Sequence, residues 1–205
     1  MLLLVGGGVY LVARDRPPEG RPRWLPLSGS VPGEASQTAP AGAFTFKDAS
    51  GQSIAYLPAG TSQRGASWAT FDARQGGYSV EYPASWVKVD RADHGGFTVY
   101  APGTNPDEQI PGGPKGVSVT WSDAYRPPDS SDRSIADLRS VTSGGVTGQL
   151  YTVGVLGKSI IAAFPRNGGY LLLQADLSGV VTAEIEQDAA TVDVFQRMLA
   201  SLKLY

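Results

Sequence analysis

The 205-residue chain contains no cysteine and a single histidine, His94. The lack of cysteine excludes a disulfide framework, thiolate zinc sites and a cysteine nucleophile. The single histidine leaves few groups for acid–base catalysis near neutral pH. The chain also has no excess of basic residues, since 17 Lys and Arg stand against 19 Asp and Glu. That balance argues against nucleic acid as a partner.

Glycine and proline, in contrast, are plentiful, with 26 and 15 residues. Hydrophobic residues make up 41% of the chain, which is enough for a packed core and excludes global disorder. A core combined with so many turn-forming residues favours a fold of many short strands.

Residues 1–13, MLLLVGGGVYLVA, form an uncharged apolar run. As a helix this run would be about 20 Å long, which is shorter than the roughly 30 Å hydrocarbon core of a bilayer. It also lacks the positive start and the small-residue cleavage site of a secretory signal. We therefore predict a partial membrane anchor or a signal remnant here, with a buried strand as the alternative.

Residues 14–42 are rich in Pro, Gly, Ser and Ala and show no apolar period, which predicts a linker. The charges divide between the two parts of the chain. Residues 1–23 carry a net charge of +2, and the remainder carries −4. By the positive-inside rule, the four arginines after the apolar run favour the cytoplasmic side of a membrane.

Residues 43–205 have the pattern of a single α+β domain. Segments 43–47 and 52–57 flank a short turn and predict a hairpin. A loop follows, and then Tyr78, Val80 and Tyr82 alternate with polar residues, as in a half-buried strand that ends at Pro83. After that break, we expect Trp86 to fold back onto the sheet.

Further strands are predicted at 97–100 and 117–121. The clearest pattern is a three-stranded antiparallel meander over 149–156, 159–165 and 169–176. Its turns are Gly157-Lys158 and Asn167-Gly168, of which the second is a strong signal for a tight hairpin.

Two helices are predicted. Ser134 and Asp137 match the capping box, with apolar residues at helical spacing behind them, so a helix of two to three turns is expected before Gly144-Gly145. An apolar stripe predicts a second helix over 188–203, capped by Asp188, although the pattern also extends back through Ile185. The stripe consists of Val192, Phe195, Leu199 and Leu202. The sum is an antiparallel β-sheet with a C-terminal helix packed on it.

Two motifs at opposite ends of this domain resemble PsbP-like domains. Residues 77–86, GYSVEYPASW, resemble the opening strand of that family, and residues 195–203, FQRMLASLK, resemble its final helix. The resemblance covers about 76–205 and implies an α/β/α sandwich around an antiparallel sheet. It also implies an extracytoplasmic location, because bacterial relatives are commonly anchored or secreted, and it transfers no catalytic residue.

The sequence predicts no catalytic, cofactor-binding or metal-binding residue. No G-x-S-x-G elbow is present. The stretch 152–159 is similar to a phosphate-binding loop but lacks its first glycine and precedes an apolar strand pattern. Asp90, Asp93 and His94 match no metal-ligand spacing. Three acids, Glu81, Asp123 and Glu184, are candidates for an enzyme that uses carboxylates.

Partner binding is the remaining hypothesis. Trp121, Tyr125 and Arg126 have the composition of an interface hot spot, and Tyr100 is expected on a nearby strand. The alternative is that Trp121 plugs the core and the other two side chains cap it. We predict a non-catalytic, membrane-tethered, extracytoplasmic binding or assembly domain with a protein or envelope partner. The alternative function is an envelope hydrolase or cation-dependent enzyme using Asp and Glu.

Overall fold

A computed structural model describes residues 25–26, 44–47, 53–56, 66–91, 95–107, 114–129, 131–132, 134–154, 158–166, 168–177 and 185–205. These residues form three antiparallel sheets and one helix. The main sheet has the strand order β6(Val87–Asp90), β7(Phe97–Tyr100), β8(Gly116–Ser122), β12(Gly169–Leu177), β11(Lys158–Arg166), β10(Val146–Val153), β9(Ile135–Ser143). Sheet A consists of β1(Leu25–Pro26), β3(Ser53–Tyr56) and β2(Phe44–Lys47), and sheet B of β13(Lys203–Leu204), β5(Tyr78–Pro83) and β4(Trp68–Ala73).

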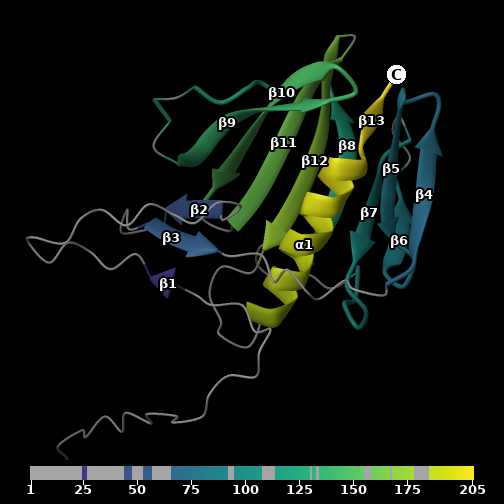
Figure 1. The fold of residues 1–205 in the computed structure, drawn as a ribbon, viewed down its shortest axis with the longest axis horizontal. Coiled ribbons are helices and arrows are strands. Elements are labelled where there is room, and N and C mark those ends of the chain that lie inside the picture. Colours follow the sequence, from purple (N-terminus) through teal and green to yellow (C-terminus); the bar gives the residue numbers. More distant parts are fainter. Residues whose placement is uncertain are drawn as a thin grey trace, which may run out of the picture.

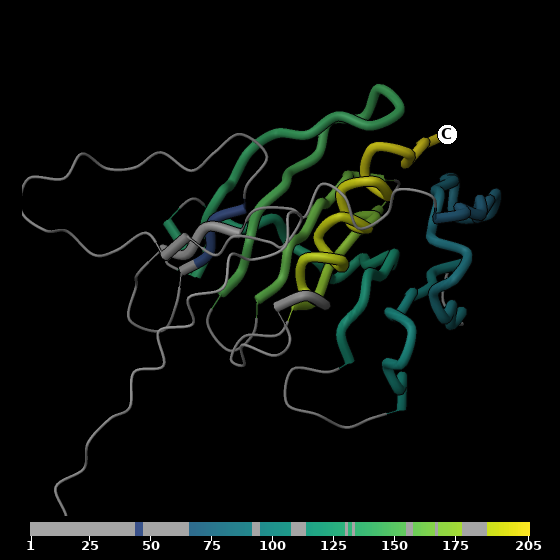
Figure 2. Tube along the Cα trace, turned by 60° about the horizontal axis from the view of Figure 1, so that its bottom comes forward, coloured from purple at the N-terminus to yellow at the C-terminus, as the bar shows by residue number. Residues whose placement is uncertain are grey.

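The fold has two layers. Helix α1(Ile185–Ser201) crosses one face of the main sheet, with sheet A on one side of it and sheet B on the other (Figure 1). Figure 2 shows the helix in front of the strands of the main sheet from a second direction. The core lies between the layers, where Phe97, Leu173 and Phe195 are fully buried. The predicted fold class, an antiparallel sheet with a C-terminal helix packed on it, is confirmed.

The apolar stripe of α1 faces this core. Val192, Phe195 and Met198 have at most 1% of their surface exposed. The helix begins at Ile185, so Asp188 lies inside it and is buried, with 3% exposure. The predicted N-cap at Asp188 is therefore wrong, because a residue whose backbone is already helical cannot precede the helix.

The predicted meander is confirmed as β10, β11 and β12. Consecutive strands pair antiparallel, with Leu150 opposite Ala162 and Ala162 opposite Leu173. Gly168 has φ +77°, the left-handed conformation that tight hairpin turns require. The hairpin predicted near residue 50 is also confirmed, as β2 and β3.

The helix predicted after Ser134 is wrong, because this segment forms β9. Gly144 and Gly145 both have positive φ, so they form a two-residue turn between β9 and β10 rather than the end of a helix. Asp137 has φ +51° and lies at a bulge, where the pairing shifts between Leu150 and Thr152. The residues that match a capping box are therefore also compatible with a bulged strand. Pairing with β10 along most of β9 stabilises the strand rather than the helix.

The loop predicted between residues 57 and 77 contains a strand, β4, which pairs with β5. Its sequence, WATFDA, alternates weakly, and only Ala73 in it is buried. Phe71 packs against Phe97 of the main sheet, with 4.5 Å between ring centroids. The local sequence pattern does not predict β4, and the packing of Phe71 on the main sheet helps to stabilise it.

Candidate binding face

The face of the main sheet turned away from α1, called here the outer face, is the candidate site. Because side chains alternate along a strand and cross-strand pairs share a face, the pairing assigns residues to it. Among the described residues no helix covers this face. Its residues include Val87 and Val89 on β6, Thr98 and Tyr100 on β7, Ser118 and Thr120 on β8, Tyr170, Leu172, Gln174 and Asp176 on β12, Ile161 on β11, and Gln149 and Tyr151 on β10.

Apolar side chains are accessible on the outer face. Val87 and Val89 have 44% and 39% of their surface exposed, and both point away from the core. Leu172 and Ile161 are half-buried at the centre of the same face. A strand face that meets only water normally carries polar residues, so these apolar groups indicate a surface suited to contact.

Three tyrosines form a cluster at one end of the outer face. The Tyr125 ring packs edge-on against Tyr170, with 5.0 Å between centroids. The Tyr125 and Tyr151 hydroxyls are hydrogen-bonded at 2.7 Å. These contacts hold the segment that follows β8 against β12 and β10, and Tyr125 itself stays half-buried.

Tyr125 and Tyr151 keep their hydroxyl protons at physiological pH. Burial raises the pKa of Tyr151, and its hydrogen bond with Tyr125 raises it further. Burial also raises the pKa of Tyr125, partly offset by that bond to Tyr151. Both hydroxyls therefore remain neutral, so the aromatic surface carries no charge of its own near pH 7.

Arg126 supplies a charge beside this cluster. Its Nη1 donates to the Asp123 and Tyr125 backbone carbonyls, at 2.8 Å in each case. The side chain is nevertheless exposed. Two bonds to backbone atoms fix the guanidinium in place without covering it, which is the arrangement expected of a pre-organised contact residue.

A buried acceptor lies near the tyrosines. Gln149 Oε1 is buried and has no hydrogen-bond partner. Gln149 and Tyr151 are two residues apart on β10, so they share the outer face at a separation of about 7 Å. Asp176, by contrast, accepts from Ser159 Oγ at 2.8 Å and Gln174 Nε2 at 2.7 Å.

Tyr100 lies on the outer face but away from the cluster. It is opposite Gly116, and a Cβ on that glycine would come within 3.0 Å of its ring. The ring therefore covers the space that Gly116 leaves, and only 9% of the residue is exposed. Ser122, next to the cluster, is six residue steps along β8 from Gly116, which corresponds to about 20 Å.

Trp121 lies on the opposite face. It pairs with Leu171, whose side chain is in the core, and its ring passes 2.8 Å from where a Cβ of Gly169 would be. The ring thus fills the space above this glycine at one end of the main sheet. Of the four predicted contact residues, the structure brings only Tyr125 and Arg126 together. That these two bind a partner stays a prediction.

The residues considered for chemistry are scattered. Glu81 Oε2 is 3.5 Å from Arg197 Nη2, and Asp123 is exposed in the segment after β8. Asp93, His94 and Glu184 lie outside the described residues. Within the described part of the chain, no group of three His, Cys, Asp or Glu side chains could hold a metal ion.

Sequence reasoning missed most of the outer face. Tyr151 and Tyr170 read as ordinary strand residues in the meander, and Val87 and Val89 follow Trp86 without a distinguishing pattern. The register between β8 and β12 would have found them, since it places Tyr170 opposite Ser122 and next to the segment carrying Tyr125. No local signal encodes that register.

No protein-family model and no curated protein matches the chain. Among solved structures, it is similar to the solution structure of cyanobacterial PsbP (CyanoP) from Synechocystis sp. PCC 6803. The match has a TM-score of 0.42 and 14% sequence identity, and it covers 68% of this chain and 94% of that chain. The match is a distant one, and no role follows from it.

Proposed function

We propose that the chain is a non-catalytic binding or assembly domain, held at a membrane by its N-terminal segment and facing the extracytoplasmic side. The outer face docks a protein partner. The observation that carries this proposal is the combination of exposed Val87 and Val89 with half-buried Leu172 and Ile161 on the face opposite the helix. Apolar groups in this position are stabilised when a second surface removes them from water.

The tyrosine cluster and Arg126 supply specificity to this surface. Tyrosine and arginine dominate the energetics of protein interfaces, because each combines a large apolar area with hydrogen-bonding groups. The partner is therefore expected to present a mixed surface, with apolar groups opposite Val87 and Val89 and a carboxylate opposite Arg126.

The membrane tether is proposed from the sequence. Residues 1–13 are apolar, and the Pro- and Gly-rich residues 14–42 provide a spacer. These residues lie outside the described part of the chain apart from Leu25–Pro26, which pair with β3. No helix among the described residues is long and apolar enough to span a bilayer.

The docking experiment places a photo-crosslinking amino acid at Val89 in the full-length chain, expressed in its native cells. We expect a crosslinked protein whose yield falls at least tenfold with Arg126→Glu, because the substitution places like charge against the partner's carboxylate. Arg74→Glu is the matched control, since Arg74 is 88% exposed on sheet B, and it should leave the yield unchanged.

Two outcomes would contradict the docking proposal. One is equal crosslinking in the Arg126→Glu and Arg74→Glu chains, with both melting midpoints unchanged. The other is a stronger crosslink from position 74 than from position 89. The tether is tested separately by fractionating the same cells, where recovery of the full-length chain without membranes would contradict it and leave the docking result standing.

A further inference from the structure

The main sheet ends in two edge strands, β9 on one side and β6 on the other (Figure 1). Strand β9 is nine residues long, and among the described residues no strand pairs with the side that faces away from β10. An edge strand presents a row of backbone N–H and C=O groups that an extended segment of another chain can pair with. The question is which residues of β9 present these groups.

The turn at the end of β9 fixes the direction of its hydrogen bonds. Gly144 and Gly145 both have positive φ and form a tight turn, so the flanking residues Ser143 and Val146 are a hydrogen-bonded pair. In an antiparallel ladder, hydrogen-bonded pairs recur at every second residue. Every second residue counted back from Ser143 therefore directs its backbone groups toward β10.

The residues between these direct their backbone groups to the open side of β9. They are Thr142, Ser140 and Leu138. All three residues are exposed, and Leu138, a large apolar side chain, has 37% of its surface exposed. Because each such residue offers one donor and one acceptor, an added strand can form up to about six backbone hydrogen bonds here.

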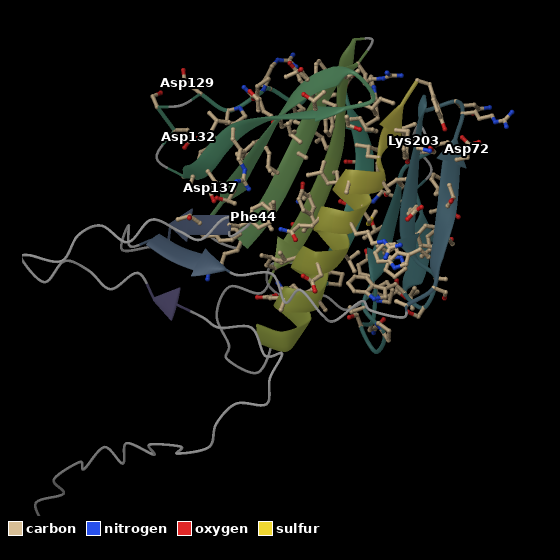
Figure 3. The ribbon with its side chains drawn as sticks, viewed as in Figure 1. Phe44, Asp72, Asp129, Asp132, Asp137 and Lys203 are labelled. Carbon is tan, nitrogen blue, oxygen red and sulfur yellow. The ribbon has the colours of Figure 1, made fainter. Side chains whose placement is uncertain are left out.

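The open stretch begins after Asp137. That residue has φ +51° at the bulge, and its carboxylate accepts from the Thr45 N–H of β2. Figure 3 shows Phe44 and Asp137 close together beside β2. The start of β9 is thus in contact with the chain's own β2, whereas residues 138–142, called here the β9 edge, have exposed side chains at four of five positions.

The opposite edge strand has the protection that the β9 edge lacks. Strand β6 has only four residues, and the Arg91 N–H donates to the Gly96 carbonyl of the β7 side at 2.8 Å. By the same alternation, the outward-pointing backbone groups of β6 belong to Lys88 and Asp90, whose side chains form an ion pair. Short edges with charged residues resist pairing with other chains. The β9 edge is longer and has Leu, Ser and Thr at the equivalent positions.

Arg139 gives the β9 edge a preference for one kind of segment. It pairs with buried Leu150, so it lies on the same face of the sheet as α1. Its guanidinium carbon is 5.3 Å from the centroid of the Phe44 ring, the side chain is exposed, and it forms no ion pair in the described part of the chain. The Cβ of a residue opposite Arg139 on an added strand would be about 5 Å away, where Asp or Glu is favoured.

We propose that the β9 edge binds an extended segment of a protein partner as an additional antiparallel strand of the main sheet. The segment carries an Asp or Glu opposite Arg139 and, next to it, an apolar residue opposite Leu138. Five residues, spanning about 17 Å, pair with the whole edge. This proposal goes beyond docking on the outer face, because strand addition uses backbone groups at the side of the sheet.

The experiment uses a random library of peptides of about seven residues, with the full-length chain as bait. We expect enrichment of β-branched and aromatic residues around an Asp or Glu, with a Kd of about 1 mM or tighter for the best peptide. Ser140→Pro should weaken binding about tenfold or more, because proline removes an outward-pointing N–H and is tolerated at an edge. Ser140→Ala is the matched control, which keeps that N–H and should bind as the parent does.

Amide hydrogen exchange of the complex gives a signature that side-chain contacts do not produce. The bound peptide should slow exchange at Leu138, Ser140 and Thr142. Exchange at Arg139 and Val141, whose N–H groups already point to β10, should change little. Equal slowing at all five residues, or slowing at none of them, would overturn the proposal.

Modified peptides keep the test decisive if Ser140→Pro does not fold. Methylation of the backbone nitrogens on either side of the acidic residue removes the donors that face β9 and should abolish binding. Methylation of the acidic residue's own nitrogen, which points away from β9, should be tolerated. Equal binding of the two peptides would overturn the proposal.

The charge preference and the occupant are tested with the same peptide. Arg139→Glu should weaken binding about tenfold or more, and Arg74→Glu should leave it unchanged. A library with no enriched sequence would overturn the proposal, and so would peptide binding that disappears as the chain dimerises through the β9 edge. Either failure leaves the crosslink from position 89 standing, since that crosslink reports on the outer face.

Discussion

Sheets A and B flank the same helix and are attached to the main sheet in different ways. Sheet B contains β13, which follows α1 in the chain and pairs with β5. It contacts the rest of the domain through the Tyr78 hydroxyl, which donates to the Gly95 carbonyl at 2.7 Å, and through Phe71 on Phe97 of the main sheet. Among the described residues, sheet A contacts the main sheet and α1 through Phe44, Thr45 and Phe46 of β2. We expect sheet B to unfold together with the core and sheet A to undock more easily.

The largest expected effect comes from a matched pair of buried phenylalanines. Phe97 and Phe46 are both fully buried. We expect Phe97→Ala to lower the unfolding free energy by about 3–5 kcal/mol. Phe46→Ala should lower the unfolding free energy by less, because the loss cannot exceed the free energy with which sheet A is docked. It should also reduce the urea m-value, since a chain with sheet A already undocked exposes less new surface on unfolding. Equal losses at an unchanged m-value would mean that sheet A belongs to the core.

A series at Asp137 tests how sheet A is held. Alanine loses the acceptor for Thr45 and is strained at positive φ, glycine loses only the acceptor, and asparagine keeps an acceptor. We expect the unfolding free energy to fall by about 2–4 kcal/mol for alanine, less for glycine and least for asparagine. Amide exchange should rise in β2 and stay unchanged in β5, and a rise confined to β5 would contradict this assignment.

Alkaline pH should act on the sheet B side. Burial, together with the nearby Asp90 charge, raises the pKa of Tyr78. The unfolded chain then releases its tyrosine proton near pH 10 while the folded chain keeps it, so stability present below pH 10 falls above it. The slope is up to about 1.4 kcal/mol per pH unit per tyrosine. Urea titrations from pH 9 to 11 should show a shallower slope for Tyr78→Phe than for the parent, and identical slopes would exclude this contribution.

The smallest expected effect concerns two stacked arginines. Arg197 lies 4.0 Å from the Trp68 ring of sheet B and near Glu81, whereas Arg139 lies 5.3 Å from the Phe44 ring of sheet A. We expect Arg197→Gln to cost about 0.5–1 kcal/mol and Arg139→Gln less. Thermal melts in low and high salt measure both losses. A larger loss for Arg139→Gln than for Arg197→Gln would mean that sheet A is held more tightly than sheet B.

Much of this architecture is encoded locally. The turn at Asn167-Gly168 predicts the meander, and the stripe of Val192, Phe195, Leu199 and Leu202 predicts α1, in both cases from neighbouring residues. The secondary-structure predictions are wrong where pairing with a strand distant in sequence determines the local structure. Asp137 matches a helix start in sequence, but β10 pairs with the residues on either side of it, Ala136 and Arg139. Trp68–Ala73 has too little pattern of its own to indicate β4.

The candidate site is less predictable than the fold, because one residue of register decides which face a side chain occupies. Trp121 and Tyr125 are four residues apart in sequence. The pairing of β8 with β12 nevertheless directs Trp121 toward Gly169 on the core side, while the chain turns and carries Tyr125 to Tyr170 on the outer side. A cluster that looks continuous in sequence is thus divided between two faces.

The central ladder of the main sheet sets an order of events during folding. It joins Ser122 to Tyr170 and Gly116 to Asp176, with strands β9, β10 and β11 enclosed between them in the sequence. Pairs so distant in sequence form slowly, whereas hairpins close within microseconds. We therefore expect the meander to assemble first and β8 to join it in the slow step. A chain halted before that step has its hairpins but lacks a continuous outer face.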